Sequence, residues 1–122
     1  MTKYIAFYGT LQSSHSTPAH DEIRKGLYRI SDCIIPGLLY RKARYPALKE
    51  GKGHVKGELY KVHNDHALAK LDKYELIDDE NPERAGFTRK RVKLLEPQVS
   101  AWVYYYDGEV SSSELIASGR WQ

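Results

Sequence analysis

The chain has 122 residues, of which 41% are hydrophobic and 29% are charged. This length and balance are typical of one globular domain, here residues 1–122, and they exclude a disordered chain. The net charge of +3 is spread along the sequence. Its densest basic run, Arg89–Lys93, is expected on a solvated strand, so the charge pattern does not favour a nucleic-acid-binding protein.

The first third of the chain predicts strands interrupted by one helix. Lys3–Tyr8 is a short, almost wholly apolar run, which indicates a buried strand. Pro18–Leu27 is expected to be a helix, because a hydroxyl residue precedes a proline at its first position. Two apolar runs follow, Ile30–Ile35 and Leu38–Tyr40. The Pro36-Gly37 pair between them predicts a bend, bulge or turn between two strand segments.

The middle of the chain predicts one strand and a second helix. Residues 41–52 are polar and irregular in pattern. His54–Val62 alternates as a half-buried strand does, and Gly57 within it indicates a close backbone approach or a tight bend. Asn64 or Asp65 then caps a helix that we expect to end near Leu76.

The last third predicts two closing strands, Phe87–Leu95 and Ser100–Tyr106, and a tail over 111–122 that forms a short helical turn or coil. The whole pattern contains about six strand segments and two helices. Because strands dominate and few helices interrupt them, we expect an α+β fold, a small mixed β-barrel flanked by two helices.

Tyrosine dominates the aromatic residues, with 10 Tyr against 2 Phe and 2 Trp. A buried tyrosine combines a large apolar ring with a hydroxyl that needs a partner. A Tyr-rich interior therefore suggests a lined cavity, although close packing alone would also account for it.

Two further features bear on location and redox chemistry. No stretch approaches the roughly 20 apolar residues of a membrane span, and the apolar run at the N-terminus is too short for a secretory signal. We therefore expect a cytoplasmic protein with no membrane contact. The single cysteine, Cys33, has apolar surroundings and no activating neighbour, so we expect it to be buried and structural.

Glu75 is the first candidate for chemistry. It shares a face of the second predicted helix with Leu68 and Leu71, the apolar stripe that should face the core. Burial and the C-terminal end of a helix dipole both oppose a carboxylate, and enzymes use such groups as general acids or bases. The pattern alone equally allows Glu75 to reach the following loop and pair with an arginine.

The turn Tyr8-Gly9-Thr10-Leu11 is the second candidate. A glycine after a strand can leave consecutive N–H groups pointing into one hollow, which would suit a carboxylate or a developing oxyanion. Taken alone, the segment is also compatible with an ordinary strand-ending turn. The five histidines show no metal-ligand spacing, so we expect no metal and no cofactor.

The order of several motifs resembles the gamma-glutamylcyclotransferase-like family, especially its small bacterial and gamma-glutamylamine-type members. The resemblance covers nearly the whole chain, and the turn together with the Leu71–Glu75 helix end is its most specific part. The motifs are Tyr8-Gly9-Thr10-Leu11, Tyr45-Pro46-Ala47-Leu48, Gly57-Glu58-Leu59-Tyr60, Leu71-Asp72-Lys73-Tyr74-Glu75, Phe87-Thr88-Arg89, Ala101-Trp102-Val103-Tyr104 and Ser118-Gly119-Arg120-Trp121.

The resemblance implies a barrel flanked by helices and an activity that releases 5-oxoproline and an amine from a gamma-glutamyl amide. It implies that the Tyr8–Leu11 backbone holds the glutamyl group and its oxyanion. Glu75 matches the catalytic glutamate, and Phe87 and Tyr104 match aromatic residues that line the pocket. The substrate's own amine would be the nucleophile, so the absence of a serine or cysteine nucleophile is explained.

Two positions depart from the family pattern. Leu76 stands where a glycine often follows the catalytic glutamate, and Phe87 stands where the family often has tyrosine, which removes a hydroxyl from the expected pocket. Two other functions stay open: a binding module that holds a small carboxylate without turnover, and a Tyr-rich barrel that stacks on single-stranded nucleic acid. The partner we expect is a small gamma-glutamyl molecule, with no nucleic acid.

Overall fold

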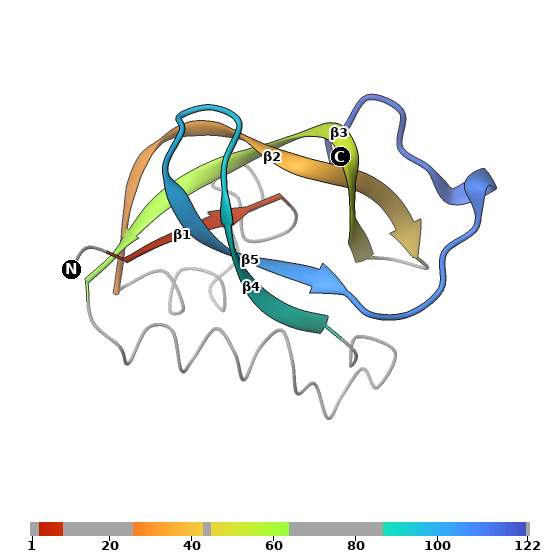
Figure 1. The fold of residues 1–122 in the computed structure, drawn as a ribbon, viewed down its shortest axis with the longest axis horizontal. Coiled ribbons are helices and arrows are strands. Elements are labelled where there is room, and N and C mark those ends of the chain that lie inside the picture. The colour runs from red at the N-terminus through yellow and green to blue at the C-terminus, as the bar shows by residue number, and fades with distance from the viewer. Residues whose placement is uncertain (1–2, 9–25, 43–44, 64–86, 122) are drawn as a thin grey trace.

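The computed structural model describes residues 3–8, 26–42, 45–63 and 87–121, which form one mixed five-stranded sheet. The sheet order is β2-β3-β1-β5-β4 (Figure 1). β1 lies at the centre, antiparallel to β3 and parallel to β5, and the other neighbours are antiparallel. The strand bounds are Tyr4–Phe7 (β1), Leu27–Lys42 (β2), Tyr45–Val62 (β3), Phe87–Lys93 (β4) and Ser100–Tyr106 (β5).

The sheet is open, so the prediction of a barrel is wrong. Closing a barrel requires the two outermost strands to pair, and in the described residues β2 and β4 lie at opposite ends of the strand order. Ile34 of β2 makes one isolated antiparallel bridge to Glu96, in the segment after β4, so the two edges approach each other only at that point within the described residues. β3 has 18 residues and β1 only 4, so β1 pairs with one part of β3 and the rest of the β2–β3 hairpin extends past it.

The β2–β3 hairpin also explains why the sheet has five strands where the sequence predicts about six strand segments. The two runs predicted as separate segments are one 16-residue strand, and the register shift between Pro36 and Leu38 confirms the predicted bulge. The prediction of irregular structure over 41–52 is wrong. Ala47 and Leu48 belong to β3, where they pair with Tyr40 and Leu39 of β2. Cross-strand pairing overrides the weak local pattern there.

The remaining strand predictions agree with the structure. The strand predicted over 54–62 is the second part of β3, and the first and fifth strands lie where their patterns placed them. A Cβ atom on Gly57 would lie 2.4 Å from the carbonyl oxygen of Phe7, which confirms the close approach. In the tail, Ser112–Glu114 forms a 3-10 turn.

The two helix predictions are mostly outside the described residues. The first was expected to reach Leu27, but Leu27 is the first residue of β2, and residues 18–25 are not described. The second, ending near Leu76, lies wholly outside the described residues. Within the described part of the chain, no helix is long and apolar enough to cross a membrane.

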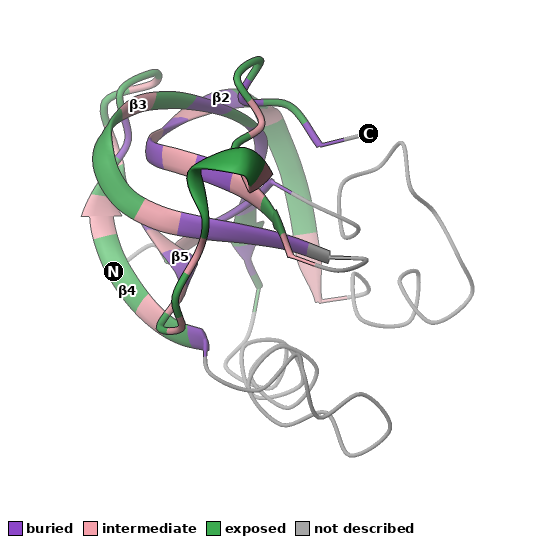
Figure 2. Cartoon of the chain, turned by 90° about the vertical axis from the view of Figure 1, so that its right-hand side faces the viewer, coloured by how far each residue is buried: buried purple, intermediate pink, exposed green. Residues whose placement is uncertain are grey.

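The strands bury different residues on the two faces of the sheet, as period-2 alternation requires (Figure 2). The aliphatic face, as we call it, includes Ala6, Cys33, Ile35, Leu48, Val55, Leu59 and Val103, and its cluster also contains Tyr8, Tyr105 and Trp121. The aromatic face is formed by Ile5, Phe7, Tyr60, Val62, Phe87 and Tyr104.

The C-terminal tail lies against β3 where β1 no longer covers it. The N–H of Lys56 donates to the carbonyl oxygen of Gly119 at 2.8 Å. Gly119 has φ +69° and a Cβ there would lie 2.2 Å from the His54 carbonyl oxygen, so the position needs glycine for both conformation and space. The tail then ends in Trp121, which is buried, and the Arg41 guanidinium lies 4.2 Å above its ring.

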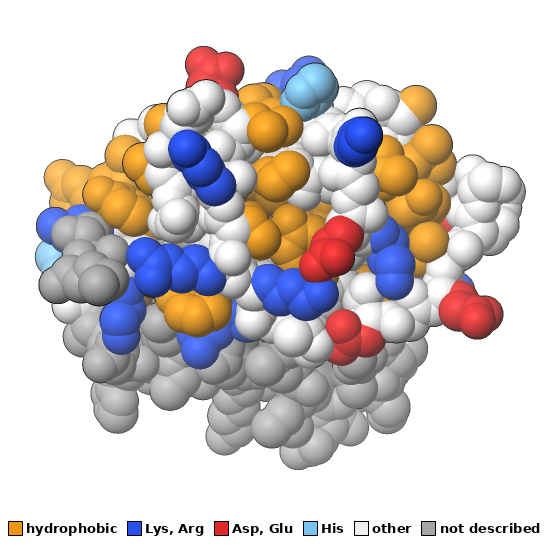
Figure 3. All heavy atoms as spheres, viewed as in Figure 1, with side chains coloured by type: hydrophobic (Ala, Val, Ile, Leu, Met, Phe, Trp, Pro, Cys, Tyr) orange, Lys and Arg blue, Asp and Glu red, His pale blue; other side chains and the backbone are white. Residues whose placement is uncertain are grey.

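The surface carries its charge in scattered form. Lys and Arg side chains are spread over the face seen in Figure 3, with acidic side chains between them. The basic run on β4 is mostly exposed, and Lys90 donates to Glu50 at 2.6 Å. This confirms a solvated strand for Arg89–Lys93.

Candidate functional site

Of the predicted site residues, the structure describes three, and it places Tyr8 in the aliphatic cluster and Phe87 and Tyr104 in the aromatic one. Tyr8 follows β1, Phe87 begins β4, and Tyr104 belongs to β5, and all three are buried. The Tyr8 hydroxyl donates to the carbonyl oxygen of Tyr104 at 2.5 Å, which ties the end of β1 to β5. Gly9, Thr10, Leu11 and Glu75 are site predictions that lie outside the described residues.

Phe87 and Tyr104 share the aromatic face. The Phe87 ring lies 5.2 Å from that of Tyr106, and the Phe7 and Tyr60 rings are also 5.2 Å apart. Tilted pairs at this spacing are favourable contacts between aromatic quadrupoles. The Tyr-rich composition therefore corresponds to an interior of packed aromatic rings, several of which donate through their hydroxyls.

Glu58 is the residue that sequence reasoning missed. Within the described part of the chain it is the only charged residue that is buried, at 8% exposure. Its Oε2 accepts from Arg29 Nε at 3.0 Å, and its Oε1 accepts from the Tyr60 hydroxyl at 3.3 Å. A carboxylate in such surroundings is stabilised by its charged and hydrogen-bonded partners.

Arg29 joins Glu58 to a second carboxylate. Its Nη2 donates to Asp32 Oδ1 at 2.6 Å, while Nε holds Glu58. The hydrogen bond to Glu58 is the largest of the effects that raise the pKa of the Arg29 guanidinium. The guanidinium thus stays charged and fixes two carboxylates on neighbouring strands.

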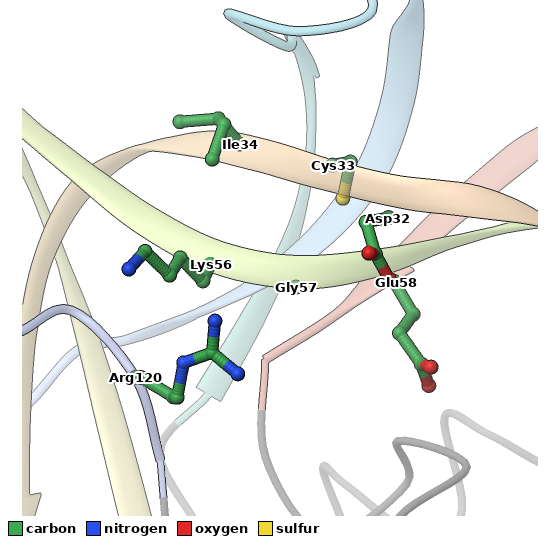
Figure 4. Close-up of a pocket in the computed structure, with 7 residues that line it drawn as sticks. All are labelled: Asp32, Cys33, Ile34, Lys56, Gly57, Glu58 and Arg120. Atoms are coloured by element: carbon green, nitrogen blue, oxygen red, sulfur yellow. The ribbon is translucent and has the colours of Figure 1, made fainter.

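These carboxylates line a pocket of about 380 Å³ between β2, β3 and the C-terminal tail. Figure 4 shows Asp32 and Glu58 together at one side, and Lys56 and Arg120 at the other. The lining residues are Asp32, Cys33, Ile34, Lys56, Gly57, Glu58 and Arg120. The pocket therefore presents both signs of charge, while Phe87 and Tyr104 lie elsewhere on the sheet.

The pocket lies beside the end of β1. Glu58 pairs directly with Phe7 in the sheet, and Gly57 packs against the Phe7 carbonyl. Tyr8, the first residue of the predicted glutamyl-binding turn, follows Phe7. The side of the pocket formed by β3 is thus next to the point where the chain leaves the sheet.

A pattern in the sequence could have identified Glu58. His54–Val62 alternates, so Glu58 shares a strand face with Tyr60 and Val62, both of which are buried. A carboxylate on an apolar strand face is the same kind of signal that singled out Glu75 on its helix. The motif Gly57-Glu58-Leu59-Tyr60 by itself indicates the family but not the burial of its carboxylate.

The burial predicted for Cys33 is confirmed. It is buried, and burial raises the pKa of its thiol to about 12. The thiol is therefore protonated at neutral pH and is a poor nucleophile. Among the described residues, no group of three or more His, Cys, Asp or Glu side chains is arranged to hold a metal ion.

Comparison with known proteins identifies the family. Residues 5–122 match the family model described as "Gamma-glutamyl cyclotransferase, AIG2-like". The chain belongs to this family. The resemblance inferred from the motifs is thereby confirmed.

Two bacterial relatives have similar sequences. A Vibrio cholerae protein named "Putative gamma-glutamylcyclotransferase" is 32% identical over 99% of this chain and 96% of its own length. The Escherichia coli gamma-glutamylcyclotransferase family protein YtfP is 35% identical over 68% of this chain and 66% of its own length.

Solved structures share the fold. Protein PH0828 of Pyrococcus horikoshii superposes with a TM-score of 0.72 at 23% identity, covering 97% of this chain and 88% of that one. The solution structure of Escherichia coli YtfP gives a TM-score of 0.66 at 26% identity, with 97% and 95% covered. A mouse AIG2-like protein gives 0.66 at 22% identity, with 99% and 88% covered.

Proposed function

We propose that the protein is a cyclotransferase that cleaves a gamma-glutamyl amide to 5-oxoproline and a free amine. The α-amine of the substrate attacks its own γ-carbonyl carbon, a C–N bond forms within the ring, and the original amide C–N bond breaks. One proton passes overall from the attacking amine to the leaving amine. No side-chain nucleophile is required, because the attacking group is already tethered to the carbonyl.

Three groups of residues have roles in this proposal. Glu75 takes the proton from the attacking amine and returns it to the leaving nitrogen. The backbone N–H groups of Tyr8–Leu11 hold the glutamyl group and stabilise the oxyanion of the tetrahedral intermediate. Phe87 and Tyr104 line the apolar side of the site.

The observation that carries the proposal is the family match over residues 5–122, which includes every one of these positions. The described structure is consistent with it at one point. β1 ends next to a charged pocket, so a turn beginning at Tyr8 would start beside a cavity suited to a polar substrate.

The experiment is a panel of gamma-glutamyl amides with different leaving amines, followed by measurement of 5-oxoproline. Glu75→Gln is run beside the wild type, with Glu50→Gln as the matched control on the exposed surface. We expect Glu75→Gln to lower kcat by about a hundredfold to ten-thousandfold, the usual contribution of a general acid or base. Glu50→Gln should keep full activity.

Two results would contradict the proposal in different ways. If folded wild-type protein makes no 5-oxoproline from any amide yet binds glutamate or 5-oxoproline, the fold serves as a binding module. If Glu75→Gln remains as active as Glu50→Gln, the reaction stands but its proton transfer belongs to another residue.

A further inference from the structure

We propose that Lys49 is a positioning residue for the aromatic side of the substrate site. Its ammonium fixes the end of β5, and through the Tyr106 ring it fixes Phe87. This inference rests on the proposed function, in which Phe87 lines the site. It adds a residue of the β2–β3 hairpin, distant from Phe87 in the sequence, that sets how tightly the substrate is bound.

The Lys49 ammonium holds two backbone carbonyls at the end of β5. Its Nζ donates to the carbonyl oxygen of Tyr106 at 3.0 Å and to that of Gly108 at 2.8 Å. The first part of β3, which carries Lys49, lies beside the end of β5 (Figure 1). Hydrogen bonds from a charged donor are stronger than neutral ones. Because the two carbonyls are two residues apart, the ammonium also fixes the direction in which the chain leaves β5.

The Tyr106 ring lies among three groups that set its position. The Lys49 Nζ lies 5.8 Å from the ring centroid, within the range of a cation–π contact. The Phe87 ring centroid lies 5.2 Å away. A Cβ atom on Gly108 would lie 2.5 Å from Cζ and from the hydroxyl oxygen of Tyr106, so the ring covers Gly108 closely. The carbonyls that Lys49 holds therefore belong to the ring's own residue and to the glycine beneath it.

The contact continues from Tyr106 to Phe87. These residues are direct partners in the β4–β5 ladder, and their rings are tilted by 53°. The next pair of residues is also joined, because Thr88 Oγ1 donates to Asp107 Oδ2 at 2.6 Å. Phe87 is buried in the same cluster as Tyr104. A displacement of the Tyr106 ring therefore changes the packing of Phe87.

Lys90 makes a contrasting contact between β4 and β3. Its Nζ donates to Glu50 at 2.6 Å and lies 5.8 Å from the centroid of the Tyr105 ring. Tyr105 belongs to the aliphatic cluster, whereas Tyr106 packs on the aromatic one. Lys90 is therefore a matched control, a lysine at the same junction whose contacts lead to the opposite face.

The first measurement does not depend on activity. The chain contains 2 phenylalanines, so labelling with fluorophenylalanine gives two fluorine NMR signals, from Phe87 and from Phe7. Lys49→Met keeps an unbranched side chain of similar length and removes the donors. We expect it to shift the Phe87 signal and to leave the Phe7 signal in place, because the Phe7 ring packs on Tyr60 instead.

Three further variants make this measurement specific. Gly108→Ala keeps Lys49 and displaces the Tyr106 ring directly, so it should shift the Phe87 signal even if Lys49→Met fails to fold. Lys49→Arg keeps a charged donor for the carbonyls and should restore the wild-type signal. Lys90→Met should leave the signal unchanged. An unchanged Phe87 signal in both Lys49→Met and Gly108→Ala would overturn the inference.

The second measurement is steady-state kinetics with the best gamma-glutamyl amide of the panel. We expect Lys49→Met to raise KM about threefold to tenfold, the fold-change that corresponds to one aromatic contact. The value of kcat should stay within about twofold, because proton transfer by Glu75 does not involve Phe87. Lys49→Arg and Lys90→Met should keep the wild-type KM.

A double-mutant cycle shows whether Lys49 acts through Phe87. Phe87→Ala should raise KM at least as much as Lys49→Met, and the double variant should exceed Phe87→Ala by less than about twofold, since residues that act through each other are not additive. Additive effects would overturn the inference while the cyclotransferase activity stands. If the wild type binds the amide but releases no 5-oxoproline, the activity is rejected, and the same cycle measured as Kd by calorimetry decides the role of Lys49.

Discussion

The two faces of the sheet bury residues of different chemistry. On the aliphatic face, Ile35, Leu48 and Leu59 are at most 1% exposed and need no polar partner. On the aromatic face, the Phe7 and Tyr60 rings pack on each other, and Glu58 forms an ion pair with Arg29. The first face provides close packing, while the second also holds a charged group with its partner.

Adjacent residues of β3 illustrate this contrast. Leu59 points into the aliphatic face, while Glu58 and Tyr60 point into the aromatic one. A change at one face should therefore affect stability, and a change at the next residue should affect the site. Three predictions sharpen this comparison, in decreasing order of expected effect.

Leu59→Ala should give the largest loss of stability. Removing a fully buried leucine side chain leaves a cavity in a close-packed interior and costs about 2–5 kcal/mol. Urea unfolding of wild type and variant at neutral pH measures the difference. A loss below about 1 kcal/mol would show that the aliphatic face is not closely packed at this residue.

Raising the pH should give the second-largest loss of stability, through Cys33 on the aliphatic face. Burial raises the pKa of the Cys33 thiol from 9.0 to about 12, so between these values the unfolded chain has lost a proton that the folded protein keeps. This group alone then lowers the free energy of unfolding by up to about 1.4 kcal/mol per pH unit as the pH rises.

The slope of stability against pH, compared between wild type and Cys33→Ala from pH 9 to 11, measures that contribution. The other titrating groups are common to both proteins, including Tyr105, whose pKa burial raises to about 12. We expect a shallower slope for Cys33→Ala. Parallel slopes would show that the thiol ionises as easily in the folded protein as in the unfolded chain.

Tyr60→Phe should give the smallest change in stability. The variant keeps the ring that packs on Phe7 and loses the hydroxyl that donates to Glu58 at 3.3 Å. One such hydrogen bond contributes about 1 kcal/mol. The same urea titration as for Leu59→Ala measures it, and a loss as large as that of Leu59→Ala would contradict the division between the two faces.

Much of the sheet could be predicted from local pattern. Ser100–Tyr106 is a short apolar and aromatic run and is β5 as predicted, and Gly57 indicated a close approach that the structure contains. The strand structure at Tyr45–Lys52 could not be predicted from the local pattern, because this part of β3 is polar and is held in place by its pairing with β2. The open sheet was also missed, since strand pattern does not reveal which edges meet.

Some features of the candidate site could likewise be predicted from the sequence, and others could not. The motif around Tyr8 indicates the correct family, and the apolar run Ser100–Tyr106 accounts for the burial of Tyr104. Phe87 is buried although it begins a basic, mostly exposed strand. The pairing of Arg29 with Glu58 could not be predicted, because it joins residues on different strands. The position of Arg120 depends on how the tail packs on β3.

The sequence by itself determined the strand pattern, the buried cysteine and the family, because each depends on residue type and spacing within short segments. Only the tertiary structure decided that the sheet stays open and that Glu58 is buried with a partner. It also decided that Asp32, Lys56 and Arg120 line one pocket beside the end of β1. These features arise from contacts between distant segments, and contacts of that kind depend on backbone pairing and burial that no local pattern encodes.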